Sequence, residues 1–529
     1  MDKLIVLLAF FCFHIILLPF GVANGTPNFS LCNQTPYPEL CTSLLTSATN
    51  YDPQMTLERT TNILDIRDFT LKFILSQATQ IHKFISTMDL SSFNELGKSA
   101  WTDCLELYED TIDKLNRSVR GFDNYPPTLN DVQTWLSAAT ANQQTCQNGF
   151  IDFNLESIPF LQTNFSKHLS NSLAINKLSA ATLSSAKQIK GRRLLGDGFP
   201  EWISGADRKL LQSSGASTKA DIVVAQDGSG HYGTISEAVS ASAKRSGGKR
   251  FIIYVKRGVY KENVEIKKSI KNIMLIGDGI DATIVTGSKN VQDGSTTFRS
   301  ATFAVSGGGF MAKGITFENT AGPQKHQAVA FRSGSDLSVF YGCSFKGYQD
   351  TLYVYSQRQF YRDCNIYGTV DFIFGDAAAV FQNCNIYIRK PMSNQWNTVT
   401  AQGRTDPNEN TGIVIHNSRI AASENMGSIK SYLGRPWKKY SRTVVMRSTI
   451  DGVIDPAGWL PWSGNFALST LYYGEYMNSG PGAATGGRVK WGGYRVITSA
   501  AEAGKFSVGN FIAGGSWIPG TGVPFTSGL

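Results

Sequence analysis

The sequence has few of the residues on which many metal proteins and hydrolases depend. Its 6 His are scattered, and its 8 Cys include no C-x-x-C pair, so zinc and thioredoxin-type sites have no support. No G-x-S-x-G motif occurs, which excludes a serine hydrolase of the usual kind. A mean hydropathy of -0.15 excludes a polytopic membrane protein, because only residues 4–20 form an apolar run long enough to enter a bilayer.

The chain is too long for one ordinary compact domain, and its charge divides it into two parts. With 42% apolar residues among 529, it is also not mainly disordered. Residues 1–211 carry 17 Lys and Arg against 20 Asp and Glu, a net charge of -3. Residues 212–529 carry 33 against 21, a net charge of +12. This asymmetry predicts two domains, the second suited to an acidic partner.

The N-terminus has the pattern of a secretory signal peptide over residues 1–25. A short charged start precedes the apolar run, and small residues follow at Gly21, Ala23 and Gly25, where we expect cleavage. The alternative is a single-pass membrane anchor, for which about 17 apolar residues lie at the lower limit of length. Glycosylation sequons support a secreted protein. They begin at Asn28, Asn33, Asn116 and Asn164, and at Asn24 if it survives cleavage.

Residues 26–190 are predicted to form an all-α pro-region. Apolar side chains recur there at spacings of three or four residues, the period of a helix with one buried face. Four such segments indicate a small four-helix bundle. They cover residues 55–85, 100–119, 130–150 and 159–181.

Four cysteines fall in this pro-region. Cys104 and Cys146 lie in adjacent predicted helices and could join them, and Cys32 and Cys41 could close a short N-terminal hairpin. The alternative is that all four are buried thiols. We favour disulfides, because a secreted chain folds in an oxidising compartment.

Residues 191–220 are predicted to form a linker that a protease cuts. Two dibasic pairs, Arg192-Arg193 and Arg208-Lys209, are each followed by Leu-Leu in a polar segment rich in Ser, Gly and Ala. A single dibasic pair is common on a solvated surface. Two copies at the boundary between the acidic and basic parts indicate processing sites.

Residues 221–529 consist of short β-rich runs that repeat. Six tripeptides occupy equivalent places after an apolar stretch, at offsets of 28, 21, 20, 34 and 30 residues. Coils of about 20 residues with loop insertions predict a right-handed parallel β-helix, whereas a β-sandwich would show more hairpin turn signals. The tripeptides begin at Ile315, Cys343, Cys364, Cys384, Ser418 and Ser448.

Three of these positions are cysteines at intervals of nearly one coil. Cys343, Cys364 and Cys384 are therefore expected to stack on successive rungs. Two of them could bridge, with Cys343 and Cys364 as candidates, or all three could remain thiols. The spacing does not choose between these alternatives.

Two aspartates share the same interval. Asp350 and Asp371 are 21 residues apart, as are Cys343 and Cys364, so both should point the same way from successive coils about 4.8 Å apart. Two carboxylates this close cannot both ionise freely, which suits one as an acid and the other as a nucleophile. The alternatives are a solvated surface pair or a calcium site, for which no further carboxylates lie nearby.

Other polar and aromatic residues surround this pair in the predicted coils. Gln327 lies 22 residues before Gln349, again about one coil, and two amides could donate hydrogen bonds to a developing oxyanion. Arg435 could clamp a carboxylate, and Trp437 could stack on a sugar ring. The alternatives are a surface cation and ordinary packing.

With these motifs the second part of the chain resembles plant pectin methylesterase, a carbohydrate esterase, from about residue 221 to the C-terminus. Residues 28–190 resemble the pectin methylesterase/invertase inhibitor family, through the cysteine pairs and the bundle. The whole is similar to a precursor with an inhibitor-like pro-region, processing sites and a catalytic domain. The segments that carry the resemblance are 221–224, 228–230, 258–260, 326–330, 347–353, 368–375, 401–405 and 433–437.

The resemblance implies a role for each matching residue. Asp371 would attack the methyl ester carbonyl, and Asp350 would protonate departing methanol and then activate water. Gln349 and Gln327 would hold the oxyanion. The products would be methanol and a more acidic pectin, and no metal or organic cofactor is implied.

Substrate and partners follow from the same resemblance. Thr297, Arg435 and Trp437, with Gln327, would bind the galacturonate chain of methylesterified pectin in the extracellular cell wall. A processing protease and proteinaceous pectin methylesterase inhibitors are the expected protein partners, nucleic acid is not expected, and the enzyme should be a monomer. The pro-region is expected to keep the enzyme inactive before processing.

The sequence departs from the family pattern at two positions. Ser418 stands where such enzymes often have a cysteine that could partner Cys384, and Ser295 replaces a frequent aromatic. Two rival functions remain, a non-catalytic pectin-binding or inhibitory wall protein and a pectate lyase. Binding alone does not need a stacked carboxylate pair, and a lyase would need a calcium-binding carboxylate cluster and a basic proton abstractor.

Overall fold

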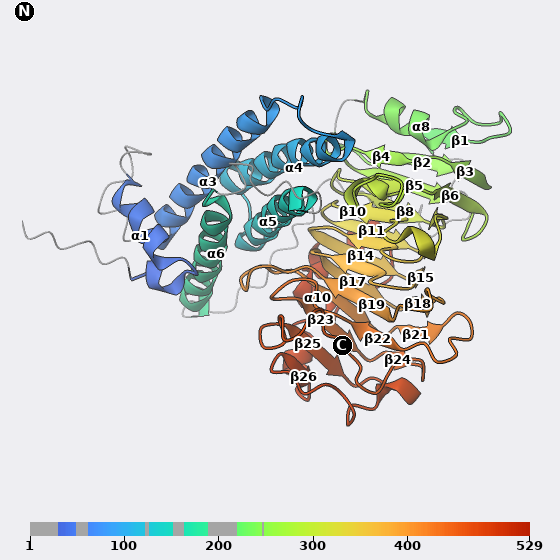
Figure 1. Cartoon of the computed structure of the whole chain (residues 1–529). Coiled ribbons are helices and arrows are strands. Elements are labelled where there is room, and N and C mark those ends of the chain that lie inside the picture. Colours follow the sequence, from blue (N-terminus) through green and yellow to red (C-terminus); the bar gives the residue numbers. More distant parts are fainter. Residues whose placement is uncertain (1–29, 49–61, 122–125, 152–162, 189–219, 246–247) are drawn as a thin grey trace, which may run out of the picture.

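The chain folds into two regions that lie side by side, a helical region and a long stack of strands (Figure 1). The structure is a computed structural model, and it describes residues 30–48, 62–121, 126–151, 163–188, 220–245 and 248–529. The predicted signal peptide, the dibasic sites, Asn24 and Asn28 lie outside the described residues.

The helical region consists of five helices, counted among the described residues. Each of the four predicted helical segments is present, and their apolar faces pack into two clusters, the larger of which also includes residues of the β-helix such as Phe298 and Tyr355. The short first helix lies at the far end from the strands (Figure 1). The helices are α1 (Pro38–Thr46), α3 (Ile63–Ser86), α4 (Glu95–Arg120), α5 (Leu129–Ile151) and α6 (Phe165–Gln188).

Helix α4 shows why the sequence begins and ends a helix where it does. Asn94 caps the N-terminus by accepting a hydrogen bond from the Gly97 backbone N–H at 2.8 Å. Arg117 and Arg120 lie in the last turn, where cations favour the negative end of the helix dipole. Gly121 then ends the helix with φ = 83°, a conformation that glycine adopts without strain.

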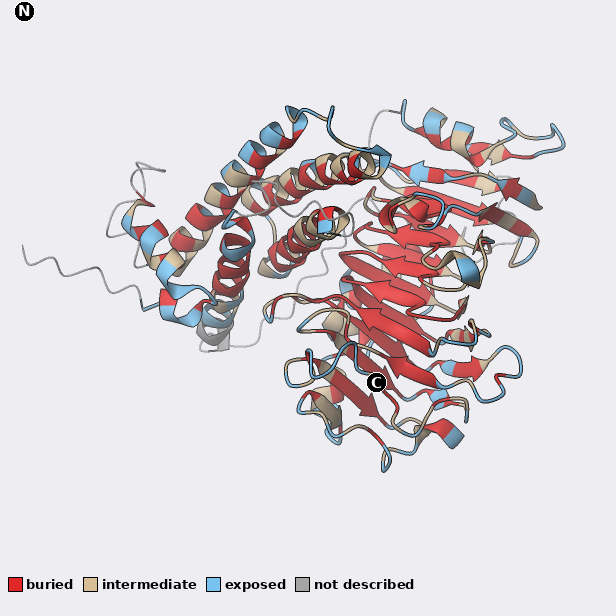
Figure 2. Ribbon diagram, viewed as in Figure 1, coloured by how far each residue is buried: buried red, intermediate tan, exposed pale blue. Residues whose placement is uncertain are grey.

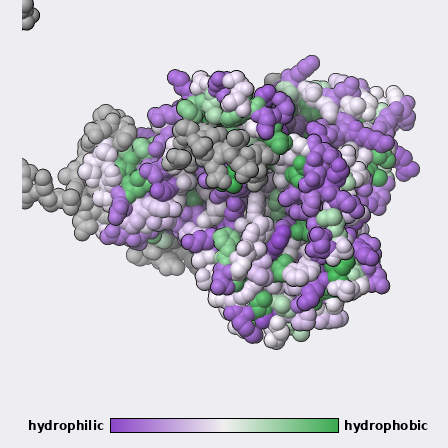
Figure 3. Space-filling view, in the orientation of Figure 1, coloured by the Kyte–Doolittle hydropathy of each residue, from purple (hydrophilic) through white to green (hydrophobic). Residues whose placement is uncertain are grey.

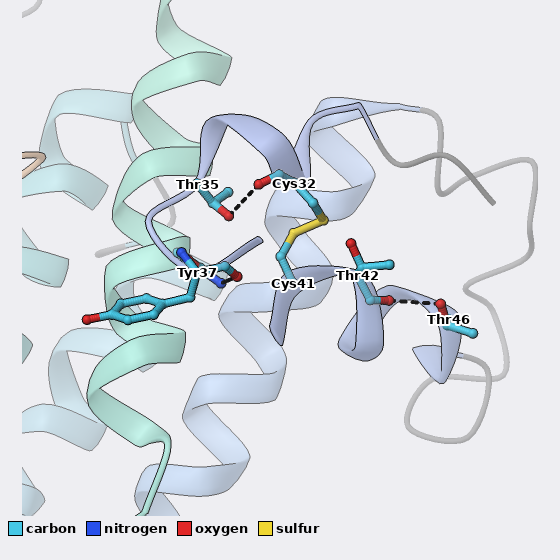
Figure 4. The surroundings of a disulfide bond; sticks show 7 residues. Cys32, Thr35, Tyr37, Cys41, Thr42 and Thr46 are labelled. Carbon is cyan, nitrogen blue, oxygen red and sulfur yellow. Dashed lines mark hydrogen bonds between the residues drawn. A yellow bond between two sulfur atoms is a disulfide. The ribbon is translucent and has the colours of Figure 1, made fainter. Parts of the chain in front are cut away.

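Two disulfides join the helices, as predicted. Cys32 and Cys41 are bonded beside the start of α1, with their Cα atoms 5.5 Å apart (Figure 4). Cys104 of α4 and Cys146 of α5 are bonded with their Cα atoms 4.6 Å apart. Both pairs are buried, so each bond also contributes to the core of the region.

The strands form three parallel sheets, and each complete coil contributes one strand to each sheet. This is the predicted parallel β-helix, preceded by the predicted helical bundle. The first sheet has eleven strands and the second has seven. The first contains β1 (Ile222–Val224), β2 (Phe251–Val255), β5 (Ile273–Gly277), β8 (Met311–Lys313), β11 (Ser338–Tyr341), β14 (Arg358–Arg362), β17 (Ala378–Gln382), β20 (Gly412–His416), β23 (Arg442–Met446), β25 (Tyr472–Tyr476) and β26 (Tyr494–Val496). The second contains β4 (Val264–Ile266), β7 (Phe303–Val305), β10 (Phe331–Ser333), β13 (Leu352–Val354), β16 (Ile373–Gly375), β19 (Asn397–Gln402) and β22 (Ser431–Gly434).

The third sheet contains the tripeptides that revealed the repeat. Thr316 pairs with Ser344, Ser344 with Asn365, and Asn365 with Asn385, and the same register continues to the sixth tripeptide. The predicted equivalence of all six is confirmed. The eight strands are β3 (Gly258–Lys261), β6 (Thr283–Gly287), β9 (Thr316–Asn319), β12 (Ser344–Lys346), β15 (Asn365–Gly368), β18 (Asn385–Ile388), β21 (Arg419–Ala422) and β24 (Thr449–Ile450).

Stacked aromatic rings fill the interior of the β-helix. Phe340 stacks on Tyr361 with ring centroids 4.5 Å apart, and Tyr361 stacks on Phe381 at 4.4 Å. In register, like side chains lie directly above one another, which gives each rung the same packing. The middle coils are therefore buried along whole strands, while the loops and end coils carry most of the exposed residues (Figure 2).

The three cysteines of the β-helix stack as predicted, but none of them is bridged. Cys343, Cys364 and Cys384 are free and buried, so the candidate bridge between Cys343 and Cys364 is not formed. Ser418 occupies the next position of this row, and its hydroxyl accepts a hydrogen bond from the Cys384 backbone N–H at 3.0 Å.

A short helix closes the N-terminal end of the β-helix. Helix α8 (Ile235–Ser242) begins with a capping box in which Thr234 and Glu237 bond to each other's backbone N–H groups. Its apolar residues Ile235, Ala238 and Val239 are buried against the first coils. The interior is thereby covered at that end.

The molecular surface is mainly polar. On the face shown in Figure 3, hydrophilic residues cover most of the described surface and hydrophobic ones form small patches. Asn33 and Asn164 of the predicted sequons are exposed, and Asn116 is half-buried on α4. Among the described helices, none is both long enough and apolar enough to cross a membrane.

Candidate active site

The two predicted aspartates lie next to each other on successive coils. Leu352 of β13 pairs with Ile373 of β16, and each follows its aspartate by two residues, so Asp350 and Asp371 occupy equivalent positions. Both have left-handed backbone conformations, with φ of 62° and 52°. Asp tolerates this conformation better than most residues, which helps to explain its use at these two sharp turns.

The carboxylate of Asp371 accepts three hydrogen bonds from two side chains. Arg435 donates two hydrogen bonds to its carboxylate, from Nε at 2.8 Å and from a terminal nitrogen at 2.6 Å. The Thr398 hydroxyl donates a third at 2.6 Å and accepts one from the Asp371 backbone N–H at 2.8 Å. A buried carboxylate with a guanidinium fork on both oxygens is held in one orientation.

Asp350 lies in a different electrostatic environment. Its pKa is raised well above the ordinary value, first by burial and then by the negative charge of Asp371, and Arg435 offsets only part of this. The raised pKa of Asp350 favours its protonated form, while Asp371 lies in an ion pair with Arg435. The pair can supply a proton donor and a nucleophilic carboxylate at the same time.

A cavity of about 390 Å³ opens in front of the pair. The structure brings together there all the residues that the sequence suggested for catalysis or substrate binding. The side-chain oxygen of Gln349 is buried without a hydrogen-bond partner among the described residues, so this amide has capacity left for a ligand. The predicted residues that line the cavity are Thr297, Gln327, Gln349, Asp350, Asp371, Arg435 and Trp437.

Aromatic side chains form one wall of the cavity. Trp437 packs on the edge of Phe374 with ring centroids 6.0 Å apart. A Cβ at Gly403 would lie 2.9 Å from the Trp437 ring, so the absence of a side chain at Gly403 fixes where this ring can lie. Trp462 stacks on the Arg435 guanidinium at 4.3 Å. Flat apolar faces beside polar groups suit a sugar ring.

The helical region covers this cavity. Asp103 of α4 and Thr145, Asn148 and Gly149 of α5 line it from the side opposite the aspartates. Lys438 of the β-helix donates a hydrogen bond to the Asn148 side chain at 3.1 Å. The aspartates are consequently buried in the full chain.

Acidic helical residues meet basic β-helix residues around this contact. Asp131 of α5 pairs with Arg358 at 2.8 Å, and Glu109 of α4 pairs with Lys268 at 3.0 Å. These pairs lie on the two parts of the chain whose net charges have opposite signs. The opposite net charges of the two parts of the chain therefore attract each other at these ion pairs.

Sequence reasoning missed three features of the site. Thr398 lies one coil from Asp371, but a threonine within a β-rich run carries no distinctive signal. Trp462 lies in a long loop outside the repeat, so no spacing connects it to Arg435. The approach of α4 and α5 depends on how two regions dock, which periodicity within either region does not specify.

Metal-binding groups are not gathered anywhere in the part of the chain that the structure describes. There, no three or more His, Cys, Asp or Glu side chains are placed to hold a metal ion. Asp350 and Asp371 stand as a pair with an arginine rather than as part of a larger acidic cluster.

Comparison with known proteins agrees with this geometry. Residues 221–515 match the family described as Pectinesterase, and residues 30–175 match Plant invertase/pectin methylesterase inhibitor. The chain is 53% identical to Probable pectinesterase/pectinesterase inhibitor 6 of Arabidopsis thaliana, over 98% of this chain and 97% of that protein. It is also 53% identical to Pectinesterase 2 of Citrus sinensis, over 94% of each. Among solved structures, Pectin methylesterase from Carrot is 62% identical with a TM-score of 0.58, and the match covers 59% of this chain and 98% of the carrot chain.

Proposed function

The chain belongs to the pectinesterase family, and from this premise we propose that its stacked aspartates cleave the methyl esters of cell-wall pectin. The protein is a pectinesterase, a carbohydrate esterase, with an inhibitor-like N-terminal region. The observation that carries the proposal is the unequal pair, in which Asp371 accepts two hydrogen bonds from Arg435 and Asp350 beside it has a raised pKa that favours its protonated form.

Asp371 attacks the ester carbonyl carbon and forms a tetrahedral oxyanion. Gln349 and Gln327 line the cavity where this oxyanion would develop, and their amide N–H groups can donate to it. The intermediate collapses as the C–O bond to methoxide breaks, and Asp350 gives its proton so that methanol leaves. The galacturonate is now joined to Asp371 as an anhydride.

Water completes the reaction. Asp350, now a carboxylate, removes a proton from water, and the resulting hydroxide attacks the galacturonate carbonyl of the anhydride. Asp371 departs as a carboxylate, the galacturonate is formed as a carboxylic acid that loses its proton to solvent, and Asp350 keeps the proton taken from water. Thr297, Arg435 and Trp437 would orient the galacturonate chain during both steps.

The test is methanol release by residues 212–529 from methylated pectin. The solved carrot enzyme consists almost entirely of the matching region, which supports independent folding of this part. We expect Asp371→Ala to lower kcat by at least about 1000-fold. Asp451→Ala, an aspartate that pairs with Arg419 and does not line the cavity, is the matched control. Full activity of Asp371→Ala would overturn the assignment.

We also propose that residues 26–190 are a pro-region that inhibits the enzyme in cis, after a signal peptide over 1–25 directs secretion to the cell wall. Support comes from α4 and α5, which line the cavity that pectin must enter. A protease that cuts within 191–220 would free residues 221–529, and separate inhibitor proteins could bind the same face afterwards.

Inhibition in cis can be measured on the intact protein. A specific protease site placed within residues 191–211 allows methanol release to be compared before and after cleavage and dilution. We expect little turnover before cleavage and a rise to the level of residues 212–529 afterwards. An uncut chain that is as active as residues 212–529 would refute inhibition.

A further inference from the structure

Helix α4 presents two carboxylates to one arginine of the β-helix. Arg299 forms ion pairs with Asp103 and with Glu106, the latter at 2.9 Å, and these acids lie one turn apart on α4. The negative charge of Glu265 in the β-helix raises the pKa of Arg299. Glu265 forms no ion pair with Arg299 among the described residues. Within that part of the chain, the ion-pair partners of Arg299 therefore come from the helical region.

The carboxylate of Asp103 is held at both of its oxygens. Thr296 donates a hydrogen bond from its hydroxyl to one oxygen at 2.7 Å, and Arg299 pairs with the other. The Asp103 side chain is only 4% exposed, and its oxygen next to Arg299 has the ion pair but no hydrogen-bond partner among the described residues. A guanidinium and a hydroxyl placed this way form a cradle for a carboxylate.

This cradle lies at the substrate cavity. Asp103, Thr296, Thr297 and Phe298 line the same cavity as the catalytic aspartates. Thr297 is also the residue proposed above to contact the galacturonate chain. In the uncleaved chain, the carboxylate of Asp103 contacts Thr296 and Arg299. A sugar next to the reacting ester could place its own carboxyl group at the same position.

A second guanidinium lies behind the cradle. Arg332 of β10 stacks on the ring of Phe298 at 3.4 Å, and it is 2% exposed. Its Nε is buried without a hydrogen-bond partner among the described residues. The positive charge of Arg332 also lowers the pKa of Asp103, against the larger effect of burial, which raises it. The β-helix therefore places two arginines near Asp103, and among the described residues neither forms an ion pair with a carboxylate of the β-helix.

From these contacts we propose that Thr296 and Arg299 form a subsite for the free carboxylate of a galacturonate near the reacting ester, and that Asp103 occupies this subsite in the uncleaved chain. A free carboxylate is charged and can accept bonds at both oxygens, whereas a methyl ester is neutral and blocks one of them. The subsite therefore recognises a sugar that has already lost its methyl group. This assignment rests on the proposed esterase activity and adds a residue that sets its specificity.

The first experiment compares two substrates on residues 212–529. One is a fully methyl-esterified galacturonate oligomer, and the other is a partly de-esterified oligomer of the same length. We expect Arg299→Gln to lower the ratio of kcat/KM for the partly de-esterified oligomer to that for the fully esterified one by about 10-fold. Thr296→Val should change the ratio in the same direction by less.

Arg419→Gln is the matched control for loss of one positive charge. Arg419 is exposed on β21 and does not line the cavity. If the general attraction between a basic domain and a polyanion determined the ratio, Arg299→Gln and Arg419→Gln would behave alike, and the subsite would be refuted. An unchanged ratio in Arg299→Gln would refute it as well.

A second experiment separates the subsite from catalysis. Calorimetry of residues 212–529 with an un-esterified galacturonate oligomer involves no ester, and Arg299→Gln should weaken binding about 10-fold. If the unmutated domain releases no methanol but binds the oligomer in an Arg299-dependent way, the proposed function fails and the subsite stands. Binding that Arg299→Gln leaves unchanged refutes the subsite, whatever the activity.

The role of Asp103 is tested in the cleaved full chain. The un-esterified oligomer should displace the helical region from the β-helix, because both would occupy the same cradle. Displacement is measured by size-exclusion chromatography after cleavage within 191–211. An association of the two parts that excess oligomer does not reduce would refute the occupation by Asp103.

Discussion

The helical region and the β-helix are stabilised in different ways. The helices are joined by two disulfides, Cys32–Cys41 and Cys104–Cys146, around modest apolar cores. The β-helix keeps its three cysteines as buried thiols and relies on stacked rungs of aromatic and aliphatic side chains. Their contact combines ion pairs and hydrogen bonds with an apolar cluster that holds Leu136 and Phe150 of the helices together with Phe298 and Tyr355 of the β-helix. The interior of the β-helix is a separate core, so we expect its rungs to keep their packing when the helical region leaves.

Removal of one disulfide should affect one region only, and this is the largest effect we expect. Cys104→Ala with Cys146→Ala opens a loop of 42 residues, which should lower the free energy of unfolding of the helical region by about 4 kcal/mol. Hydrogen exchange of peptides from α4 and α5 measures the change, and peptides from β13 and β16 provide the internal control. Equal loss of protection in both sets would show that the regions do not unfold separately.

The contact between the regions should weaken as pH rises. Burial raises the pKa of Asp103 from 3.8 to about 6 in the docked state, with Arg299 offsetting part of the rise. A group whose pKa is higher when docked takes up a proton on docking. Its contribution to docking is therefore complete below about pH 4 and is lost as pH rises through about 6, by up to about 100-fold in the dissociation constant.

This pH dependence is measured on the cleaved full chain by the fraction of the two parts that remains associated. Asp103→Asn cannot titrate, so this variant should lose the change between pH 4 and 6 while keeping an amide next to Thr296. Asp89→Asn, an exposed aspartate of the helical region, is the control. A dissociation constant that changes equally with pH in Asp103→Asn would assign the effect to other groups.

A change confined to the β-helix should give the smallest effect. Gly403→Ala places a Cβ 2.9 Å from the Trp437 ring and should shift that ring, so that KM for pectin rises by about 5-fold with little change in kcat. Gly233→Ala, where a Cβ would meet no atom within 4 Å, serves as the control. An unchanged KM would show that Trp437 does not form the sugar platform.

The sequence predicted most of what lies within each region. The offsets of the six tripeptides specified the register of the third sheet, and the same interval placed Asp350 beside Asp371. This works because residues that are one coil apart in the sequence lie on neighbouring rungs, directly above one another. Helical periodicity identified all four long helices for the related reason that one face of each is buried.

The sequence did not predict what depends on exact side-chain geometry or on docking. The candidate bridge between Cys343 and Cys364 is not formed, and an interval of 21 residues places two thiols on neighbouring rungs without showing whether they bond. Asp103 and Arg299 are nearly 200 residues apart and belong to elements with different periods. No pattern within either element indicates that they meet.

Helix α8 has a consequence for the behaviour of the protein at high concentration. The first coil of a β-helix has strands with an unpaired edge, and its apolar interior is open at that end. The last coil of another copy could pair with this edge and cover this interior. Ile235, Ala238 and Val239 of α8 cover that cross-section. A chain without this helix would offer a surface on which copies could add end to end, as in a growing fibre. The eight residues of α8 therefore cover a surface through which copies of the β-helix could otherwise pair.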